Sequence, residues 1–222
     1  MRFETKFLAA IASAALCFPQ LHAADSVPLA IKLPAHTAKG TPEDLPTGPN
    51  IEPPPKTAPA PIQVPTGVVN VALGKKVTAS VAPYSGELTQ ITDGKREPFD
   101  EDVVEFKKGT QWVQVDLGQD FEIHAIAMWH DHRVLQAFHD VLVQVSDDPE
   151  FKTGVTTIYN NDVDNSSKLG VGTDREYFEL EYGRIVPVKA VKGRYVRGIT
   201  KGSSLSAINC WQELEVYALP AK

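Results

Sequence analysis

The chain has 222 residues, with 22 Lys and Arg against 28 Asp and Glu, a formal net charge of −6 and two cysteines. The length suits one or two domains, and the hydrophobic fraction of 42% excludes wholesale disorder. The negative charge argues against nucleic acid or an anionic membrane as the main partner, because both select clustered Lys and Arg.

The first 23 residues have the order of a secretory signal peptide. Two basic residues precede an apolar run at 7–17, and small residues near Ala23 offer a cleavage site. The apolar run spans only about half of a bilayer core, which argues against a membrane anchor. This order predicts a secreted or periplasmic protein. The mature chain then keeps one cysteine, Cys210, and cannot form an internal disulfide.

The segment 24–66 is rich in proline and contains eleven of the 17 prolines. Proline fixes φ and donates no backbone hydrogen bond, so the segment is expected to form neither helix nor inner strand. It also lacks aromatic residues and a repeating apolar face. We therefore predict a disordered, semi-stiff linker with polyproline II character. It would serve as a tether for the following domain or as a passive tail.

Residues 67–219 have the texture of a β domain. Runs rich in Val, Ile and aromatic residues, bounded by Gly, Asp, Asn or Pro, lie at 111–117, 121–129, 140–146, 155–159, 177–182, 194–199 and 211–218. Their lengths and boundaries predict an all-β sandwich of antiparallel strands, with helices limited to short turns. In the first run the alternation places Val113, Val115 and Leu117 on the core face. Asp116 is expected to cap the turn at Gly118.

Six short blocks occur in order between residues 70 and 217. They read NVALGKKVTAS (70–80), ITDG (91–94), QWVQVDLG (111–118), VQVSDD (143–148), GRYVR (193–197) and ELEVY (213–217). Together they resemble the discoidin, or coagulation factor 5/8 type C, domain, which is similar to family 32 carbohydrate-binding modules. The resemblance implies an eight-stranded antiparallel jelly roll of the galactose-binding-like kind.

The resemblance also implies a structural Ca²⁺ beneath the binding loops. Asp93 and Glu213 match the family's metal-binding positions, and Asp100 or Asp102 could supply a further oxygen, because Ca²⁺ takes six to eight oxygen ligands. The loop after Asp93 departs from the family pattern, and its Lys95 and Arg96 could instead neutralise Asp93. A second acidic segment, 160–166, offers similar oxygens, but its Asn and Asp residues are equally typical of a turn.

The loop after Trp129 carries the candidate ligand-binding residues. Sugar-binding members of the family use a His, an Arg and an Asn from this end, together with a stacking aromatic. Such sets suit sugars, because polar groups bind hydroxyls while an aromatic face covers C–H groups. The predicted ligand-binding residues here are His130, His132, Arg133, Phe138, His139 and Trp211. Phe138 stands where the family has its asparagine.

The same histidines allow two other interpretations. Side chains two apart in an extended segment point the same way, so His130 and His132 could converge with His139 on Zn²⁺, Cu²⁺ or Ni²⁺. They could also be structural.

No catalytic motif is found in the sequence. It lacks G-x-S-x-G, HExxH, a P-loop and a spaced cysteine pair, and Cys210 has no identifiable general base, so an enzyme is not expected. The first hypothesis is an exported, non-catalytic module that binds extracellular or cell-wall carbohydrate. The alternatives are an adhesion or assembly protein that binds a cell-surface protein, and a transition-metal carrier.

Overall fold

The computed structural model describes residues 25–36, 38 and 44–221, so the predicted signal peptide at 1–23 lies outside the described residues. The elements are β1 (Ser26–Pro28), β2 (Gln63–Pro65), β3 (Val69–Asn70), β4 (Lys76–Ala79), the 3₁₀ segments η1 (Leu88–Thr92) and η2 (Asp100–Asp102), β5 (Val104–Phe106), β6 (Gln111–Trp129), β7 (Gln136–Phe138), β8 (Leu142–Ser146), β9 (Thr156–Asn160), β10 (Tyr177–Glu179), β11 (Arg184–Thr200), β12 (Asn209–Trp211) and β13 (Glu213–Pro220). The described residues contain no α-helix, and the predicted all-β antiparallel fold is confirmed. None of their helices is long and apolar enough to cross a membrane.

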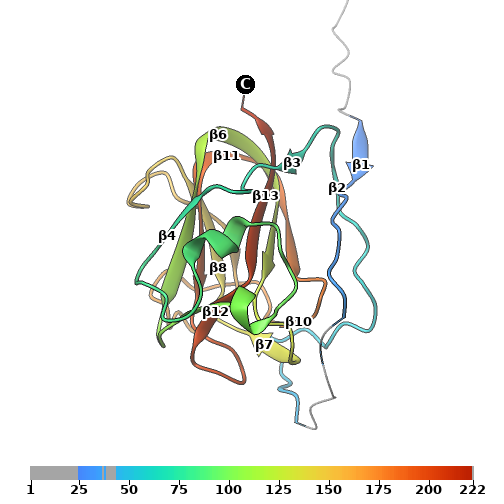
Figure 1. The fold of residues 1–222 in the computed structure, drawn as a ribbon, viewed down its shortest axis with the longest axis vertical. Coiled ribbons are helices and arrows are strands. Elements are labelled where there is room, and N and C mark those ends of the chain that lie inside the picture. Colours follow the sequence, from blue (N-terminus) through green and yellow to red (C-terminus); the bar gives the residue numbers. More distant parts are fainter. Residues whose placement is uncertain (1–24, 37, 39–43, 222) are drawn as a thin grey trace, which may run out of the picture.

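The two longest strands, β6 and β11, pass through both layers of the sandwich (Figure 1). The first half of β6 pairs with β4 and the second half pairs with β13, while β11 follows β6 antiparallel along most of its length. The main sheet has the order β3-β13-β6-β11-β8-β9. Gly118, with φ of 89°, lies between the two halves of β6, and its N–H donates to Asp116 Oδ1 at 2.8 Å, as predicted.

The core lies between the two layers. Val113, Val115 and Leu117 from the first half of β6 are at most 1% exposed, which confirms the predicted core face. Ile126 and Met128 from the second half belong to the same buried cluster. Because alternate side chains of a strand point to opposite faces, each half contributes one side to this interior.

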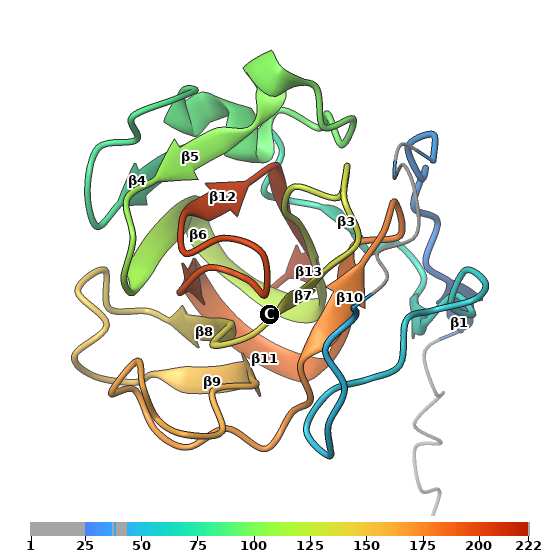
Figure 2. The same cartoon turned by 90° about the horizontal axis from the view of Figure 1, so that it is seen from below.

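The Pro-rich segment differs from its prediction. We call the described residues of 25–66 the arm. In the arm, β1 pairs with β2, and Leu29 and Val64 are buried in a cluster with Trp129 and three other residues of the domain. Figures 1 and 2 show the arm alongside the sandwich. The prediction of a disordered linker over 24–66 is therefore corrected for these residues.

A second contact fixes the middle of the arm beside β10. Ile51 is buried with Ala137 and Phe178, and the N–H of Glu52 donates to the Glu176 carbonyl oxygen at 2.8 Å. The guanidinium of Arg184, at the start of β11, donates to both Glu52 carboxylate oxygens at 2.9 Å. A few apolar side chains, backbone hydrogen bonds and the Arg184–Glu52 ion pair thus help to hold a segment that forms little regular structure.

Candidate functional site

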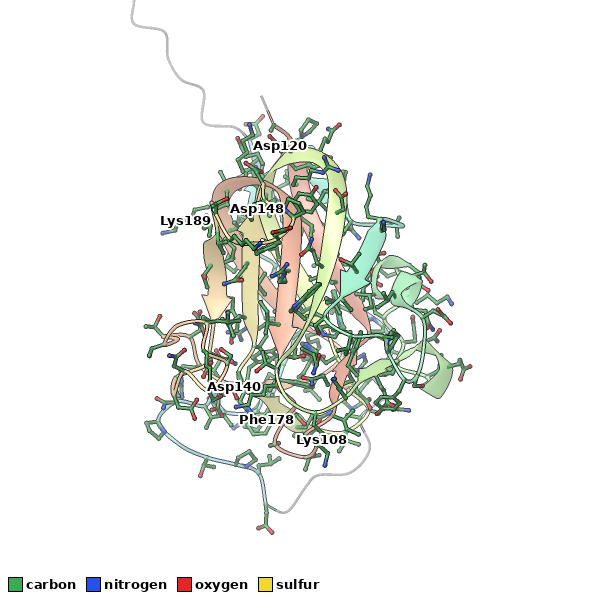
Figure 3. All side chains as sticks on the ribbon, turned by 90° about the vertical axis from the view of Figure 1, so that its left-hand side faces the viewer. Lys108, Asp120, Asp140, Asp148, Phe178 and Lys189 are labelled. Carbon is green, nitrogen blue, oxygen red and sulfur yellow. The ribbon has the colours of Figure 1, made fainter. Side chains whose placement is uncertain are left out.

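The predicted ligand-binding residues lie at one end of the sandwich, where β6 ends. The segment that follows β6, which includes β7, and the loop that follows β11 meet there: Ser204 N donates to the carbonyl oxygen of Ala137 in β7 at 2.8 Å, and Ala137 N donates to Ser204 Oγ at 3.0 Å. Asp140 and Phe178 mark this end in Figure 3, opposite Asp120 and Lys189. The two loops therefore form one connected surface, the loop end.

His130 lies inside the loop end and has no exposed surface. Its Nδ1 is 2.9 Å from Glu179 Oε2, and its backbone N–H donates to the other oxygen of the same buried carboxylate. Its ring stacks on Phe138, with centroids 4.5 Å apart, and its centroid lies 4.6 Å from that of Trp211. These contacts give His130 a structural role between β7, β10 and β12.

The structure corrects the sequence prediction for four of the six ligand-binding residues. His130, Phe138 and Trp211 are at most 2% exposed. His132 is also fully buried, with Nε2 2.9 Å from the Arg96 carbonyl oxygen. Side chains without exposed surface do not contact a glycan. Rings bury a large apolar area when they pack together, and that gain outweighs leaving them on a loop surface.

Arg133 and His139 are the predicted residues that remain accessible, each with 33% of its side chain exposed. Arg133 donates from Nε and from a terminal nitrogen to the two carboxylate oxygens of Asp131, at 2.8 and 2.7 Å. His139 Nδ1 lies 3.3 Å from Asp140 Oδ2, and this hydrogen bond raises the pKa of His139. Burial raises the pKa of Asp131. The two predicted ligand-binding residues that remain accessible, Arg133 and His139, are thus polar and are held in place by neighbouring carboxylates.

Three further side chains complete the accessible part of the loop end. Lys201 Nζ lies 3.7 Å from Asp140 Oδ2, and Val134 and Leu205 are 43% and 60% exposed. We call Arg133, Val134, His139, Lys201 and Leu205 the loop-end surface. The sequence analysis missed Val134, Lys201 and Leu205, because no spacing pattern marks them. The small polar run around Leu205 indicates only a loop.

The predicted calcium site has a buried carboxyl group at its centre. Glu213 has no exposed surface and accepts the Gly94 N–H at 3.2 Å from each oxygen. Burial and the neighbouring Glu215 raise its pKa to about 9, and Asp93 adds to the effect. Glu215, by contrast, is paired with Arg96 and accepts the Tyr217 hydroxyl at 2.7 Å.

The surroundings of Glu213 fit a cation in part. Glu213 forms no ion pair within the part of the chain that the structure describes, and a buried carboxyl group next to a second carboxylate is the kind of donor that Ca²⁺ uses. Asp93 is also paired with Lys95, at 3.6 Å, as the sequence analysis allowed. Lys95 Nζ lies 3.5 Å from Asp102 too. Asp100 begins η2, and its side chain lies outside the described residues.

The structure does not bring the histidines together as a metal site. Among the described residues, the one group of three potential ligands within 4.8 Å of one another is Asp140, Asp162 and Asp164. These carboxylates bind their own loop: Ser166 Oγ donates to Asp140 at 2.9 Å, and Ser167 N donates to Asp162 at 2.8 Å. Although burial opposes it, the bonds from Ser167 hold the pKa of Asp162 at about 2. The transition-metal prediction is therefore wrong as a three-histidine site, and the aspartates form a turn.

The free thiol of Cys210 lies in surroundings that oppose its ionisation. Burial raises the pKa of Cys210 to about 12. A thiol rather than a thiolate is therefore present at neutral pH, and thiols are poor nucleophiles.

The fold matches a known family of domains. Residues 90–197 match the F5/8 type C family described as NedA-like, galactose-binding domain. Chitosan-binding module 1 of a chitosanase/glucanase from Paenibacillus sp. has 21% identity to this chain, covering 67% of this chain and 98% of the module, with a TM-score of 0.47.

Two other structures show the same likeness. CpGH89 from Clostridium perfringens, solved with GlcNAc-alpha-1,4-galactose, is 18% identical over 69% of this chain and 15% of its own length, with a TM-score of 0.52. A fucose binding module from Streptococcus pneumoniae is 17% identical over 68% of this chain and 98% of the module, with a TM-score of 0.47. No curated protein matches the chain. Over residues 90–197 the chain is therefore similar to the F5/8 type C family of galactose-binding-like domains, as its six sequence blocks predicted.

Proposed function

We propose that this protein is an exported, non-catalytic module that binds extracellular or cell-wall carbohydrate through the loop-end surface. The observation that carries the proposal is the accessible set Arg133, His139 and Lys201, placed on joined loops of a galactose-binding-like domain. The signal-like order of residues 1–23 supports export. The absence of a catalytic motif in the sequence supports binding without cleavage.

The chemistry of the loop-end surface suits sugar hydroxyls. The Arg133 guanidinium is already oriented by Asp131, and the His139 imidazole by Asp140. Groups that are held before the ligand arrives lose less conformational freedom on binding. The exposed side chains of Val134 and Leu205 can cover the C–H groups of a sugar ring.

A glycan array probed with the full chain tests this function. We expect the wild-type protein to bind at least one glycan class, and an Arg133→Ala/His139→Ala double variant to bind it at least about tenfold more weakly. Arg194→Ala is the matched control, because Arg194 is an accessible arginine paired with Asp116 on another face. Equal binding by the double variant and the wild type would overturn the site. A wild-type protein that binds no glycan would overturn the function.

The second candidate is a protein partner at the same surface. Val134 and Leu205 favour it, because exposed aliphatic side chains are common at protein interfaces. In that case the chain binds no glycan on the array. A cell-surface protein fraction binds the wild-type chain but not the Leu205→Ala variant.

We also propose structural Ca²⁺ at Glu213, with Asp93 as the second carboxylate. When bound, the cation would neutralise the two carboxylates and tie the Gly94 turn to β13. Addition of Ca²⁺ should raise the melting temperature of the wild-type protein and leave that of Glu213→Gln unchanged. An equal rise for both proteins, or none for either, would contradict this site.

A further inference from the structure

The arm and the domain enclose a groove that the loop end does not use. Two cavities lie beside the arm: the larger, of about 140 Å³, is lined by arm residues 52–59, by β10 and by residues 180–184, and the smaller, of about 70 Å³, is lined by arm residues 29–33 and 59–62 with Tyr182 and Ile185. Tyr182 and Pro59 line both cavities, so the two are parts of one groove. We call it the arm groove.

The stiffness of the arm keeps the groove open. The proline-rich span is anchored at one end by Glu52, which is bonded to Glu176 and Arg184, and at the other by Ile62, which packs against the buried cluster that contains Trp129. Between these points lie five prolines (53, 54, 55, 59 and 61). Prolines have no N–H to donate to a strand and resist bending. The prolines therefore limit how far this span can pair with the strands of the domain.

The lining of the arm groove is mainly apolar: aliphatic side chains such as Leu29, Ile31 and Ile185 line the smaller cavity, and rings with a few polar groups line the larger one. The Tyr182 ring and the pyrrolidine rings of Pro53, Pro55 and Pro59 offer apolar faces, and Thr57 is an exposed hydroxyl on the arm side. Gly183 also lines the larger cavity, directly after Tyr182. Apolar ring faces with scattered hydroxyls suit the C–H patches and hydroxyls of sugar rings.

The charged groups in and beside the arm groove pair with one another. Arg184 binds both oxygens of Glu52 at 2.9 Å. Next to Tyr182, Glu181 accepts a hydrogen bond of 2.7 Å from His36 of the arm. A groove whose ion pairs are already satisfied gains nothing from a charged ligand, because such a ligand would have to break a pair.

We propose that the arm groove is a second saccharide site, selective for uncharged sugars, and that it rests on the carbohydrate-binding function proposed above. The groove needs the arm, which precedes the part of the chain that matches the family. A chain with two separate saccharide sites holds a polymer more tightly than either site alone, because the second contact is intramolecular.

The test is a titration of the full chain, monitored by amide NMR, with the tetrasaccharides of glucose, mannose, galactose and N-acetylglucosamine. Tetragalacturonic acid is the charged comparison. We expect a neutral tetrasaccharide to shift the Thr57 and Tyr182 signals and tetragalacturonic acid to leave them in place. Tyr182→Ala should weaken this contact at least about fivefold. Thr57→Trp, which blocks the groove from its exposed side, should do the same while the fold stays intact.

Tyr195→Ala is the matched control, because Tyr195 is a partly exposed tyrosine of the opposite layer, paired with Asp116. It should bind like the wild-type protein. Saccharide binding that both Tyr182→Ala and Thr57→Trp retain, but that Arg133→Ala/His139→Ala abolishes, would overturn the arm groove and leave the loop-end function standing. The absence of any saccharide binding would overturn both.

Discussion

Glu213 is a buried carboxyl group that forms no ion pair with the other described residues. It is buried in β13, and its pKa is raised to about 9, above the ordinary value of 4.5, by burial and by Glu215. In a folded chain without a bound cation this carboxyl group keeps its proton at neutral pH, whereas in the unfolded chain it is ionised. The folded state therefore binds the extra proton between about pH 4.5 and pH 9, and stability from this group is lost as pH rises through that window.

This difference predicts a pH-dependent effect of Glu213→Gln. In EDTA, the wild-type free energy of unfolding should fall between pH 5 and pH 8 by at least about 1 kcal/mol more than that of the variant, which has no carboxyl group to titrate. Urea unfolding at the two pH values measures this difference. Glu150→Gln, at a carboxylate 63% exposed, should keep the wild-type slope. Parallel pH dependence in wild type and Glu213→Gln would contradict the assignment.

The His130–Glu179 contact predicts a stability effect at a residue first expected to bind ligand. Both side chains are fully buried. Glu179→Ala removes the partner of the imidazole and of the His130 N–H, so it should lower the free energy of unfolding by about 3 kcal/mol. Chemical denaturation measures this, with Glu150→Ala as a control expected to change it by less than about 0.5 kcal/mol. A loss at Glu179 no larger than at Glu150 would contradict the structural role.

At the scale of the element, the turn into β11 depends on a glycine. Gly183 has φ of 62°, and a Cβ there would lie 2.5 Å from Trp129 Cε2 and 2.6 Å from the Met128 carbonyl oxygen. Gly183→Ala should therefore cost about 3 kcal/mol in the free energy of unfolding. Gly154→Ala separates the cost of the positive φ from the cost of the steric contact, because Gly154 has φ of 60° but open space around it. It should cost about 1 kcal/mol. Equal losses at the two positions would show that the contact with Trp129 is unimportant.

The arm also makes a prediction at this scale. Leu29, directly after β1, is 8% exposed and packs with Trp129, whereas Val27 in β1 is 39% exposed. Leu29→Ala should cost about 2 kcal/mol and speed amide exchange across β1 and β2, while Val27→Ala should do neither. Urea unfolding and hydrogen exchange give the two readouts. Wild-type exchange of the β1 and β2 amides in Leu29→Ala would mean that Leu29 does not fix the arm.

The strands of the domain could be predicted because each buries a regular face. Val113, Val115 and Leu117 alternate with polar residues, so their positions in the sequence report the core directly. The arm has no such signal. Its buried residues, Leu29 and Val64, are far apart in the sequence and are separated by prolines, and only contact with the domain makes them core.

Only part of the candidate site could be proposed from the sequence, which indicated Arg133 and His139 but not that the other four predicted residues are buried. The two-residue spacing of His130 and His132 indicates a shared direction, but it does not show whether that direction is inward. The partners that draw His130 inside, Glu179 and Trp211, come from distant strands. Lys201 and Leu205 join the surface through a loop contact that no local pattern encodes.

At the scale of the whole molecule, the arched strands β6 and β11 connect the two layers and place both ends of each strand at the same end of the sandwich (Figures 1 and 3). The joined loops 130–135 and 201–208 are thereby built on the most extensively paired strands of the domain. A site on a rigid scaffold keeps its geometry without the ligand, which suits a module that binds and does not cleave.

Hydrogen exchange of the intact chain tests this account most directly, measured with and without the glycan selected on the array. The account predicts slower exchange at residues 131–140 and 201–206 in the presence of the glycan, lost in Arg133→Ala/His139→Ala, with the glycan recovered at unchanged mass. Protection that spares both loops, or a glycan recovered in fragments, would contradict it.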